Sequence, residues 1–272
     1  MSARTYLMCP PEHFTVSYAI NPWMTTGEPV DEGRAMQQWQ ALRDMYRSLG
    51  HTVQLIDAVP GLPDMVFAAN GAVVVDDSVL GARFRHPERA AEGPAYLDWF
   101  RAHGYRNVYE PRHVNEGEGD IIYTGGVILA GYGFRTDPSV KYELEEVFGL
   151  PVVSLRLVDP RFYHLDTALC VLNDDTAAYY PPAFDDEGRA ALSSLFPELI
   201  EAKDSDAEVL ALNAVSDGHH VVLPSQADGL ADRLAAAGFE PVRVDMSEFR
   251  KAGGGPKCCT LELRPTHEGV AQ

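Results

Sequence analysis

The chain has 272 residues and a formal net charge of −18, because 40 Asp and Glu outnumber 22 Lys and Arg. Hydrophobic residues make up 46% of the chain and charged residues 23%, which is typical of globular and not of disordered proteins. An acidic surface repels phosphate, which argues against nucleic acids and anionic membranes as partners. A small cationic substrate is compatible with this charge, although solvated surface carboxylates explain most of it more simply.

The sequence carries no signal for secretion or for a cysteine-based metal site. Its four cysteines, Cys9, Cys170, Cys258 and Cys259, are too few for a disulfide scaffold, and no two form a Cys-x-x-Cys pair. Residues 1–14 lack the apolar core of a signal peptide, and no run approaches 18 apolar residues. We therefore expect a cytoplasmic protein with free thiols.

Strand-like and helix-like segments alternate from the N-terminus onward. Apolar residues at three- and four-residue steps predict a helix over 32–49, which ends at Gly50, and a strand over 52–56 follows. Two short apolar runs flank Asn70-Gly71, the strongest short hairpin signal. A helix is predicted next over 88–103, with a short strand at Val108.

The same order of two strands, a helix and a strand then recurs three times. The predicted segments are 120–122, 127–129, 139–148 and 152–157; then 167–172, 177–180, 187–200 and 208–212; then 214–215, 220–223, 226–237 and 241–244. A last strand over 259–263 has no helix after it. Residues 6–8, the helix over 32–49 and the strand after it supply the missing parts, so both chain ends contribute to one unit.

These units have a nearly constant length. Their first positions, Asp64, Asp120, Asp166, Asn213 and Cys258, lie 56, 46, 47 and 45 residues apart. Such a period is typical of arrays or propeller-like rings, and a unit shared by both ends would close a ring. We therefore expect a single α/β domain over residues 1–272. The alternative is an ordinary mixed α/β domain whose spacing is regular by chance.

In a closed ring, the first strand of each unit lines the axis, so polar residues near those strands converge. They are Asp64, Asn70, residues 116–120, His164, Asp166, Asn213 and Cys258. Carboxylates, amides, a histidine and a thiol are unusual in a packed core because each buried polar group needs a partner. This set therefore predicts a functional site at the axis.

Cys258 and His164 are the candidates for chemistry at this site. Three glycines and Lys257 precede Cys258, which suggests close approach of the backbone to a ligand and a thiol pKa lowered by the ammonium. The plainer alternative is a loop followed by a small buried cysteine, as we expect for Cys259. Strand alternation would place His164 and Asp166 on one face, where a histidine can move protons; a hydrogen-bonded histidine at a strand edge is the alternative.

Charged residues suggest what the site binds. Residues 116–120 hold three carboxylates that repel one another unless a cation or solvent lies among them. Arg135, Arg83 and Arg85 are candidate anchors for a substrate carboxylate, although a lone arginine is more often a surface residue. Together these groups fit an amino acid with a guanidinium head that is attacked by sulfur. We expect no metal, since adjacent His219 and His220 would face opposite sides of a strand.

Five motifs carry a resemblance to a known family. They are residues 62–71 (LPDMVFAANG), 115–120 (NEGEGD), 133–136 (GFRT), 164–167 (HLDT) and 253–258 (GGGPKC). In this order, and over nearly the whole chain, the sequence resembles the guanidine-modifying enzymes, also called penteins or the amidinotransferase superfamily. The resemblance implies a five-bladed α/β propeller built from ββαβ units, which agrees with the repeat.

The resemblance also implies roles for individual residues. Cys258 would attack the guanidinium carbon to form a thiouronium-type intermediate, and His164 would protonate the leaving amine and activate water. Glu116 and Asp166 would hold the guanidinium nitrogens, with Glu118 competing with Glu116 because the family motif is usually shorter. The further substrate-binding candidates are Arg135 and Arg85 for the α-carboxylate, and Asp64, Asn70 and Asn21. No organic cofactor or metal is required.

Asn70 distinguishes branches of this superfamily. Dimethylargininases and arginine deiminases usually have an acidic residue there, so the chain looks like the arginine dihydrolase branch, which converts arginine to ornithine, carbon dioxide and two ammonia. An amide would let a neutral citrulline-like group stay bound for a second hydrolysis. The alternatives are a dimethylargininase, an amidinotransferase and a propeller-shaped binding protein without catalysis. The sequence is also compatible with a homo-oligomer.

Overall fold

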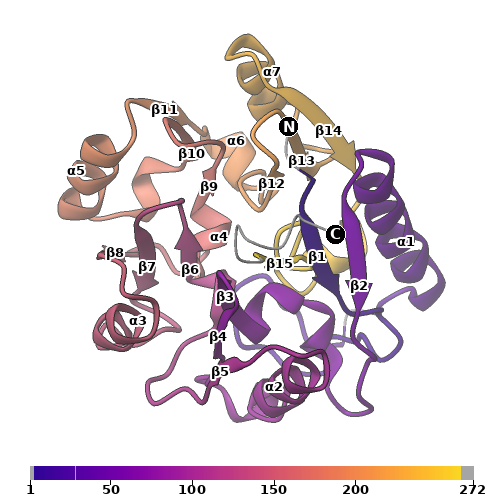
Figure 1. The fold of residues 1–272 in the computed structure, drawn as a ribbon. Coiled ribbons are helices and arrows are strands. Elements are labelled where there is room, and N and C mark those ends of the chain that lie inside the picture. The colour runs from indigo at the N-terminus through magenta and orange to yellow at the C-terminus, as the bar shows by residue number, and fades with distance from the viewer. Residues whose placement is uncertain (1–2, 28, 265–272) are drawn as a thin grey trace.

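The computed structural model describes residues 3–27 and 29–264. Within these residues the strands form five three-stranded sheets that stand around a ring (Figure 1). In every sheet the middle strand pairs antiparallel with one neighbour and parallel with the other. A helix connects the two parallel strands, as a parallel crossover requires. The predicted five-bladed α/β ring of ββαβ units is therefore confirmed.

Four of the five blades are continuous in the chain. The first has β3 (Ala72–Val75), β4 (Ser78–Gly81), α2 (Glu92–Ala102) and β5 (Asn107–Tyr109). The second has β6 (Ile121–Tyr123), β7 (Ile128–Tyr132), α3 (Val140–Phe148) and β8 (Val152–Arg156). The third has β9 (Leu169–Val171), β10 (Thr176–Tyr179), α5 (Asp186–Leu195) and β11 (Glu198–Glu201). The fourth has β12 (Val215–Ser216), β13 (His220–Pro224), α7 (Asp228–Ala236) and β14 (Glu240–Val244).

The fifth blade joins the two ends of the chain, as predicted. It consists of β15 (Leu261–Leu263), β1 (Thr5–Met8), α1 (Glu32–Ser48) and β2 (Thr52–Leu55). Leu7 lies opposite Leu261 in the antiparallel pair. Arg4 and Glu262 add an ion pair of 3.1 Å between the same two segments. In Figure 1 the indigo β1 and the yellow β15 lie side by side in the ring.

Helix α1 shows how local sequence places an outer helix of the ring. The Asp31 side chain caps it by accepting from the Arg34 backbone N–H, and its apolar face buries Ala35, Trp39 and Leu42. Because these residues recur every three to four positions, only one side of α1 packs against the blade. The opposite side remains solvated, which is consistent with surface carboxylates carrying much of the net charge.

Short helical turns precede the inner strands of the blades. They are η1 (Pro63–Val66) and η2 (Ala68–Gly71) before β3, η4 (Gly117–Gly119) before β6, α4 (Leu165–Ala168) before β9, α6 (Asp204–Ala207) before β12, and α8 (Ser247–Arg250) before β15. Two further turns, η3 (Pro87–Arg89) and η5 (Pro181–Ala183), lead into α2 and α5. Six of the predicted site residues lie on or directly beside the first group of turns: Asp64, Asn70, Glu116, Glu118, His164 and Asp166.

Two predicted elements are wrong. Asn70-Gly71 is not a hairpin turn but part of η2, because Gly71 is packed so closely that a Cβ there would lie 2.3 Å from the Tyr96 ring. The hairpin closes instead at Asp76-Asp77, where Asp76 takes a positive φ of 47°. The predicted strand over 208–212 is a turn. The third strand of that blade is β11, because Pro197 keeps residue 196 extended and so ends the helix early.

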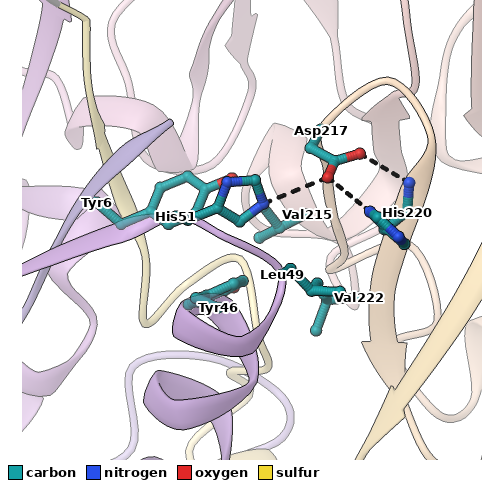
Figure 2. Close-up of a pocket in the computed structure, with 8 residues that line it drawn as sticks. All are labelled: Tyr6, Tyr46, Leu49, His51, Val215, Asp217, His220 and Val222. Atoms are coloured by element: carbon teal, nitrogen blue, oxygen red, sulfur yellow. Dashed lines mark hydrogen bonds and ion pairs between the residues drawn. The ribbon is translucent and has the colours of Figure 1, made fainter. Parts of the chain in front are cut away.

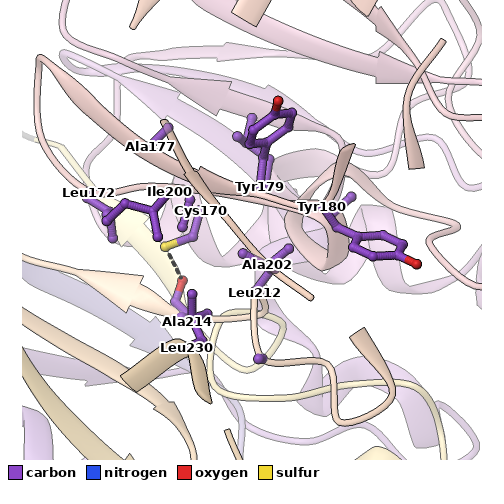
Figure 3. Close-up of a cluster of buried hydrophobic side chains, with 14 of the residues drawn as sticks. Cys170, Leu172, Ala177, Tyr179, Tyr180, Ile200, Ala202, Leu212, Ala214 and Leu230 are labelled. Atoms are coloured by element: carbon purple, nitrogen blue, oxygen red, sulfur yellow. Dashed lines mark hydrogen bonds between the residues drawn. The ribbon is translucent and has the colours of Figure 1, made fainter. Parts of the chain in front are cut away.

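Apolar side chains fill the space between neighbouring blades. Figure 3 shows one buried cluster, to which β10, β11 and α7 contribute Ala177, Ile200 and Leu230. Cys170 in this cluster donates a weak hydrogen bond from Sγ to the Ala214 carbonyl at 3.4 Å. The third and fourth blades therefore share one core. No helix among residues 3–27 and 29–264 is both long and apolar enough to cross a membrane.

Candidate active site

The predicted site residues are brought together at the inner ends of the blades. Asn70 lies on η2, Glu116 directly precedes η4, and His164 and Asp166 lie at the start of α4, while Cys258 follows α8. All five are at least 98% buried. Such a concentration of buried polar side chains requires a network of partners.

Cys258 is held by two side chains from neighbouring turns. The Asn213 side chain donates from Nδ2 to Sγ at 3.1 Å and accepts from the Cys258 backbone N–H at 3.1 Å. The thiol donates to Asp166 Oδ2 at 3.4 Å. Burial, together with the Asp166 carboxylate, raises the pKa of the Cys258 thiol well above its usual value, and burial raises the pKa of Asp166 to about 7. Both effects favour the protonated thiol over the thiolate at Cys258.

His164 and Glu116 form the second group. His164 Nε2 donates to Glu116 Oε2 at 2.7 Å, and Arg135 Nη1 donates to the same oxygen at 2.8 Å. Burial raises the pKa of Glu116, but Arg135 and His164 together outweigh burial and hold it well below its usual range. An ionised Glu116 accepting the Nε2 proton leaves Nδ1 as the ring nitrogen that faces away from Glu116.

Asn70 and Asp64 belong to a third group, which is organised by Arg89. Arg89 Nη1 donates to Asn70 Oδ1 at 2.8 Å, and Arg89 lies 3.9 Å from Asp64 Oδ2. Glu92 receives Arg89 Nε and Nη2 on its two carboxylate oxygens, at 2.9 and 2.7 Å. Since Arg89 is fixed by this bidentate pair, the orientation of the Asn70 amide is fixed as well.

Four buried polar atoms of this network have no partner among the described residues. They are Asp64 Oδ1, Asn70 Nδ2, His164 Nδ1 and Asp166 Oδ1. A Cβ on Gly119 would lie 2.4 Å from Asn70 Nδ2 and 3.0 Å from His164 Nδ1, so both atoms adjoin one glycine backbone. Buried polar atoms without partners are costly unless a ligand satisfies them. Two carboxylate acceptors, one amide donor and one imidazole nitrogen match a polar, cationic head group.

Three sequence interpretations need correction. His164 and Asp166 do not share a strand face: His164 caps α4 and Asp166 lies in its first turn, because Asp120 Oδ1 accepts from the Leu165 backbone N–H at 3.0 Å. Lys257 does not act on the thiol, since its Nζ donates to Glu118 at 2.7 Å. The three glycines approach protein groups; a Cβ on Gly254 would lie 2.2 Å from the Phe67 ring.

Other predicted residues lie beside the network rather than within it. Glu118 is buried in ion pairs with Lys257 and Arg264, which face away from the His164 group. Arg85 is exposed, and its Nε donates to the Arg135 carbonyl at 2.6 Å. Asn21 donates from Nδ2 to the Ala252 carbonyl at 3.1 Å, beside the glycine run. Glu116 and Glu118 therefore have different partners: Glu116 contacts His164, whereas Glu118 pairs with Lys257 and Arg264. The sequence could not distinguish these two surroundings.

Sequence reasoning missed two residues of the site and misinterpreted one pair of histidines outside it. Arg89 and Glu92 were not singled out, although their spacing of three residues is a recognisable ion-pair signal. His219 and His220 do not face opposite ways: their ring centroids are 4.7 Å apart, because β13 begins only at His220 and strand alternation does not extend to His219.

Comparisons with known proteins agree with this geometry. A profile of the family of eukaryotic N,N-dimethylarginine dimethylhydrolases matches residues 21–265. The chain is 57% identical over 262 residues to the N(G),N(G)-dimethylarginine dimethylaminohydrolase of Mycobacterium tuberculosis, a match that covers 96% of this chain and 86% of that protein. The chain belongs to the dimethylarginine dimethylhydrolase family. Within the pentein superfamily, this member is a hydrolase that acts on guanidine C–N bonds of arginine-type substrates, which confirms the predicted enzyme class.

Proteins named as arginine dihydrolases are also similar to this chain. The bifunctional arginine dihydrolase/ornithine cyclodeaminase AgrE of Nostoc is 39% identical over 265 residues, but the match covers 95% of this chain and only 37% of AgrE. The N-terminal domain of the cyanobacterial arginine dihydrolase ArgZ, solved with substrate bound, superposes with a TM-score of 0.93 at 37% identity over 97% of this chain and 99% of that domain. The dimethylargininase of Pseudomonas aeruginosa, at 19% identity and a TM-score of 0.82, shares the fold.

Proposed function

We propose that this chain is an arginine dihydrolase, which converts arginine to ornithine, carbon dioxide and two ammonia. Asn70 carries the proposal. Its Oδ1 is held by Arg89 at 2.8 Å, so among the described residues its Nδ2 is a buried donor without a partner. An amide N–H can donate to the neutral carbonyl of a ureido group, whereas a carboxylate cannot. A site with this donor retains citrulline for a second hydrolysis as well as binding arginine.

The remaining groups suit the two ends of arginine. Asp64, Glu116 and Asp166 supply carboxylates for the guanidinium nitrogens. Within residues 3–27 and 29–264, one oxygen each of Asp64 and Asp166 has no hydrogen-bond partner and can accept from the substrate. Arg135 is the proposed anchor for the α-carboxylate. Its Nη2 donates to the Ile20 carbonyl at 2.9 Å, which connects this arginine to the segment that contains Asn21.

The first hydrolysis begins with a change in the charge around Cys258. A bound guanidinium opposes the effects of burial and of Asp166, so it lowers the pKa of the thiol and favours the thiolate. The thiol proton passes to His164, the sulfur forms a bond to the guanidinium carbon, and a C–N bond breaks as His164 returns that proton to the departing nitrogen, which leaves as ammonia. Water attacks the resulting thiouronium-type carbon, His164 accepts its proton, and the thiolate leaves to give citrulline.

The second hydrolysis uses the same groups. With the ureido oxygen held by Asn70 Nδ2, the Cys258 sulfur forms a bond to the ureido carbon, and the terminal C–N bond breaks as His164 protonates that nitrogen to give the second ammonia. A second water displaces the sulfur from the resulting thiocarbamate. The product is the carbamate of ornithine, which decomposes to ornithine and carbon dioxide. Each round consumes one water and restores the thiol. No metal or organic cofactor takes part in this scheme, since sulfur supplies the covalent step.

A dimethylargininase is the second candidate. The family profile and the 57% identical relative both carry that name. In this case Nω-methylated arginine would give citrulline and a methylamine, and the reaction would stop after one round. The Asn70 amide would then have no second hydrolysis to support.

One experiment separates the candidates. Purified protein is incubated separately with arginine, citrulline, agmatine and asymmetric dimethylarginine, and the products are identified by mass spectrometry with ammonia quantified in parallel. We expect ornithine and two ammonia per arginine, with ornithine also formed from added citrulline. Citrulline and dimethylamine from dimethylarginine, without ornithine from arginine, would establish the dimethylargininase instead. Agmatine as the best substrate would contradict Arg135 as the carboxylate anchor.

We further propose that residues 1–272 act as one catalytic domain, because both chain ends contribute to the fifth blade. The cytoplasmic location predicted from the sequence stays a prediction, as does self-association.

A further inference from the structure

A second cluster of ligating side chains lies on the fourth blade, apart from the groups that hold Cys258. His220 and Glu240 are direct neighbours at the start of the parallel strands β13 and β14. Glu240 Oε2 lies 3.5 Å from His219 Nε2 and 3.8 Å from His220 Nε2. We propose that His219, His220 and Glu240 bind one divalent transition-metal ion of the Zn²⁺ type.

The separations of the three donors suit such an ion. One ligand atom from each residue lies within 4.8 Å of the other two. Zinc–nitrogen and zinc–oxygen bonds of about 2.1 Å at tetrahedral angles place donor atoms about 3.4 Å apart. The two histidine–glutamate distances are already near that value, so small side-chain rotations complete the site. Glu240 and His219 are 63% and 45% exposed, which lets an ion enter from solvent and leaves the fourth position to water.

Asp217 prepares His220 for metal binding. Its Oδ2 accepts from His220 Nδ1 at 2.8 Å, and its Oδ1 accepts from the His220 backbone N–H at 2.7 Å (Figure 2). The same Oδ1 accepts from the His219 backbone N–H at 2.9 Å. The His220 proton is thereby fixed on Nδ1, and the Nε2 lone pair points toward Glu240. Metal-bound histidines use the same carboxylate contact.

The same aspartate connects this cluster to the blade that closes the ring. His51, which precedes β2 of the fifth blade, lies with Nε2 3.3 Å from Asp217 Oδ2, and its Nδ1 accepts from the Arg4 backbone N–H at 3.3 Å (Figure 2). Asp217 thus connects the fourth blade to the fifth blade. An ion on His220 would strengthen this junction, so binding should also raise the melting temperature.

The experiment measures metal binding directly in the full chain. Protein stripped with a chelator and then freed of it is titrated with Zn²⁺ against a chromogenic zinc indicator, and with Co²⁺ followed by visible absorption. Because the thiol of Cys258 can itself bind zinc, every measurement uses the Cys258→Ser background. The test variants are His219→Ala and Glu240→Gln. Glu198→Gln is the matched control, since Glu198 is likewise the exposed first residue of its outer strand but lies opposite Thr176.

We expect one Zn²⁺ per chain, and a Co²⁺ spectrum without a thiolate charge-transfer band. Both test variants should weaken zinc binding about tenfold or more and abolish the rise in melting temperature, whereas Glu198→Gln should change neither. Arginine hydrolysis by the His219→Ala chain with Cys258 intact should equal that of wild type. The absence of zinc binding in the Cys258→Ser background, or equal binding by His219→Ala and Glu240→Gln, would overturn the proposal.

Discussion

Asn213 holds Cys258 at both ends, with its amide nitrogen 3.1 Å from the sulfur and its amide oxygen 3.1 Å from the Cys258 nitrogen. The same nitrogen also reaches the Asp166 carbonyl at 3.2 Å. Three consecutive inner turns of the ring therefore meet at one side chain. A donor directed at the sulfur stabilises the thiolate more than the thiol, which partly offsets the burial of Cys258.

Replacing Asn213 with Asp tests this donor. The substitution keeps an oxygen for the Cys258 backbone N–H but exchanges the N–H donor at the sulfur for a negative charge. We expect the pKa of the thiol to rise by at least one unit, so alkylation by iodoacetamide at pH 8 should slow about tenfold or more. The measurement is the rate of labelling at Cys258 by peptide mass spectrometry. An unchanged rate would show that the amide only supports the backbone.

Adjacent cysteines provide an internal comparison for the nucleophile. Cys258 contacts Asn213 and Asp166, whereas Cys259 is fully buried in the apolar cluster around Tyr46. We expect Cys258→Ser to lower kcat with arginine by about 10³-fold or more and Cys259→Ser to retain most of it. Steady-state rates and near-ultraviolet circular dichroism of both variants check this. Comparable losses of kcat in two folded variants would contradict the assignment.

The identity of residue 70 should decide where the reaction stops. Asn70→Asp keeps the oxygen that accepts from Arg89 but removes the free amide donor. A carboxylate still favours cationic arginine and repels the ureido oxygen, so we expect citrulline to accumulate with one ammonia per arginine. Time courses of citrulline and ornithine give the answer. Continued formation of ornithine at the wild-type rate would show that the second hydrolysis does not need the Asn70 amide.

Two glutamates that the sequence could not distinguish should give opposite phenotypes. Glu116 contacts His164, so Glu116→Gln should lower kcat about 10²-fold or more. Glu118 is paired with Lys257 and Arg264, so Glu118→Gln should leave partly unpaired buried cations and lower the melting temperature by roughly 5–10 °C. Calorimetry and steady-state kinetics on both variants separate the effects. The reverse pattern would indicate that Glu118, and not Glu116, contributes to catalysis.

The fold was predictable because its period is long and repeated. A spacing near 46 residues remains recognisable even when a single element is predicted wrongly. The ring was therefore predicted correctly although the strand at 208–212 was misplaced. Local details were less predictable where tertiary contacts override a turn signal. Asn70-Gly71 has the composition of a hairpin, yet Gly71 packs against Tyr96 and the backbone closes into a 3₁₀ turn.

The site was predictable in its residue types and less so in its contacts. Lys257 is adjacent to Cys258 in sequence, and only the direction of its side chain assigns it to Glu118. Arg89 was missed because its importance comes from long-range contacts to Asn70 and Asp64, which no local pattern encodes. Sequence spacing therefore located the axis of the ring. The hydrogen-bond and ion-pair partners of the side chains at the axis could be assigned only from the three-dimensional structure.

Asp166 should make stability depend on pH in a specific direction. Burial raises the pKa of its carboxyl to about 7, compared with about 3.9 in an unfolded chain. Between these values the folded state keeps a proton that the unfolded state has released, so this contribution is full below about pH 4 and is lost as pH rises to about 7. The difference corresponds to at most about 4 kcal/mol. Asp166→Asn should therefore show a smaller decline in melting temperature between pH 4 and 7 than wild type.

Calorimetry is the suitable measurement for this comparison, because urea and guanidinium resemble the groups that the site is proposed to bind. Asp174→Asn, in an exposed turn, is the matched control and should follow the wild-type pH profile. Glu92 and Asp120, whose pKa values burial raises to about 7 and about 6, keep contributing in every variant, so the decline should shrink without disappearing. A decline as steep in Asp166→Asn as in wild type would mean that Asp166 is ionised beside Cys258 in the resting enzyme.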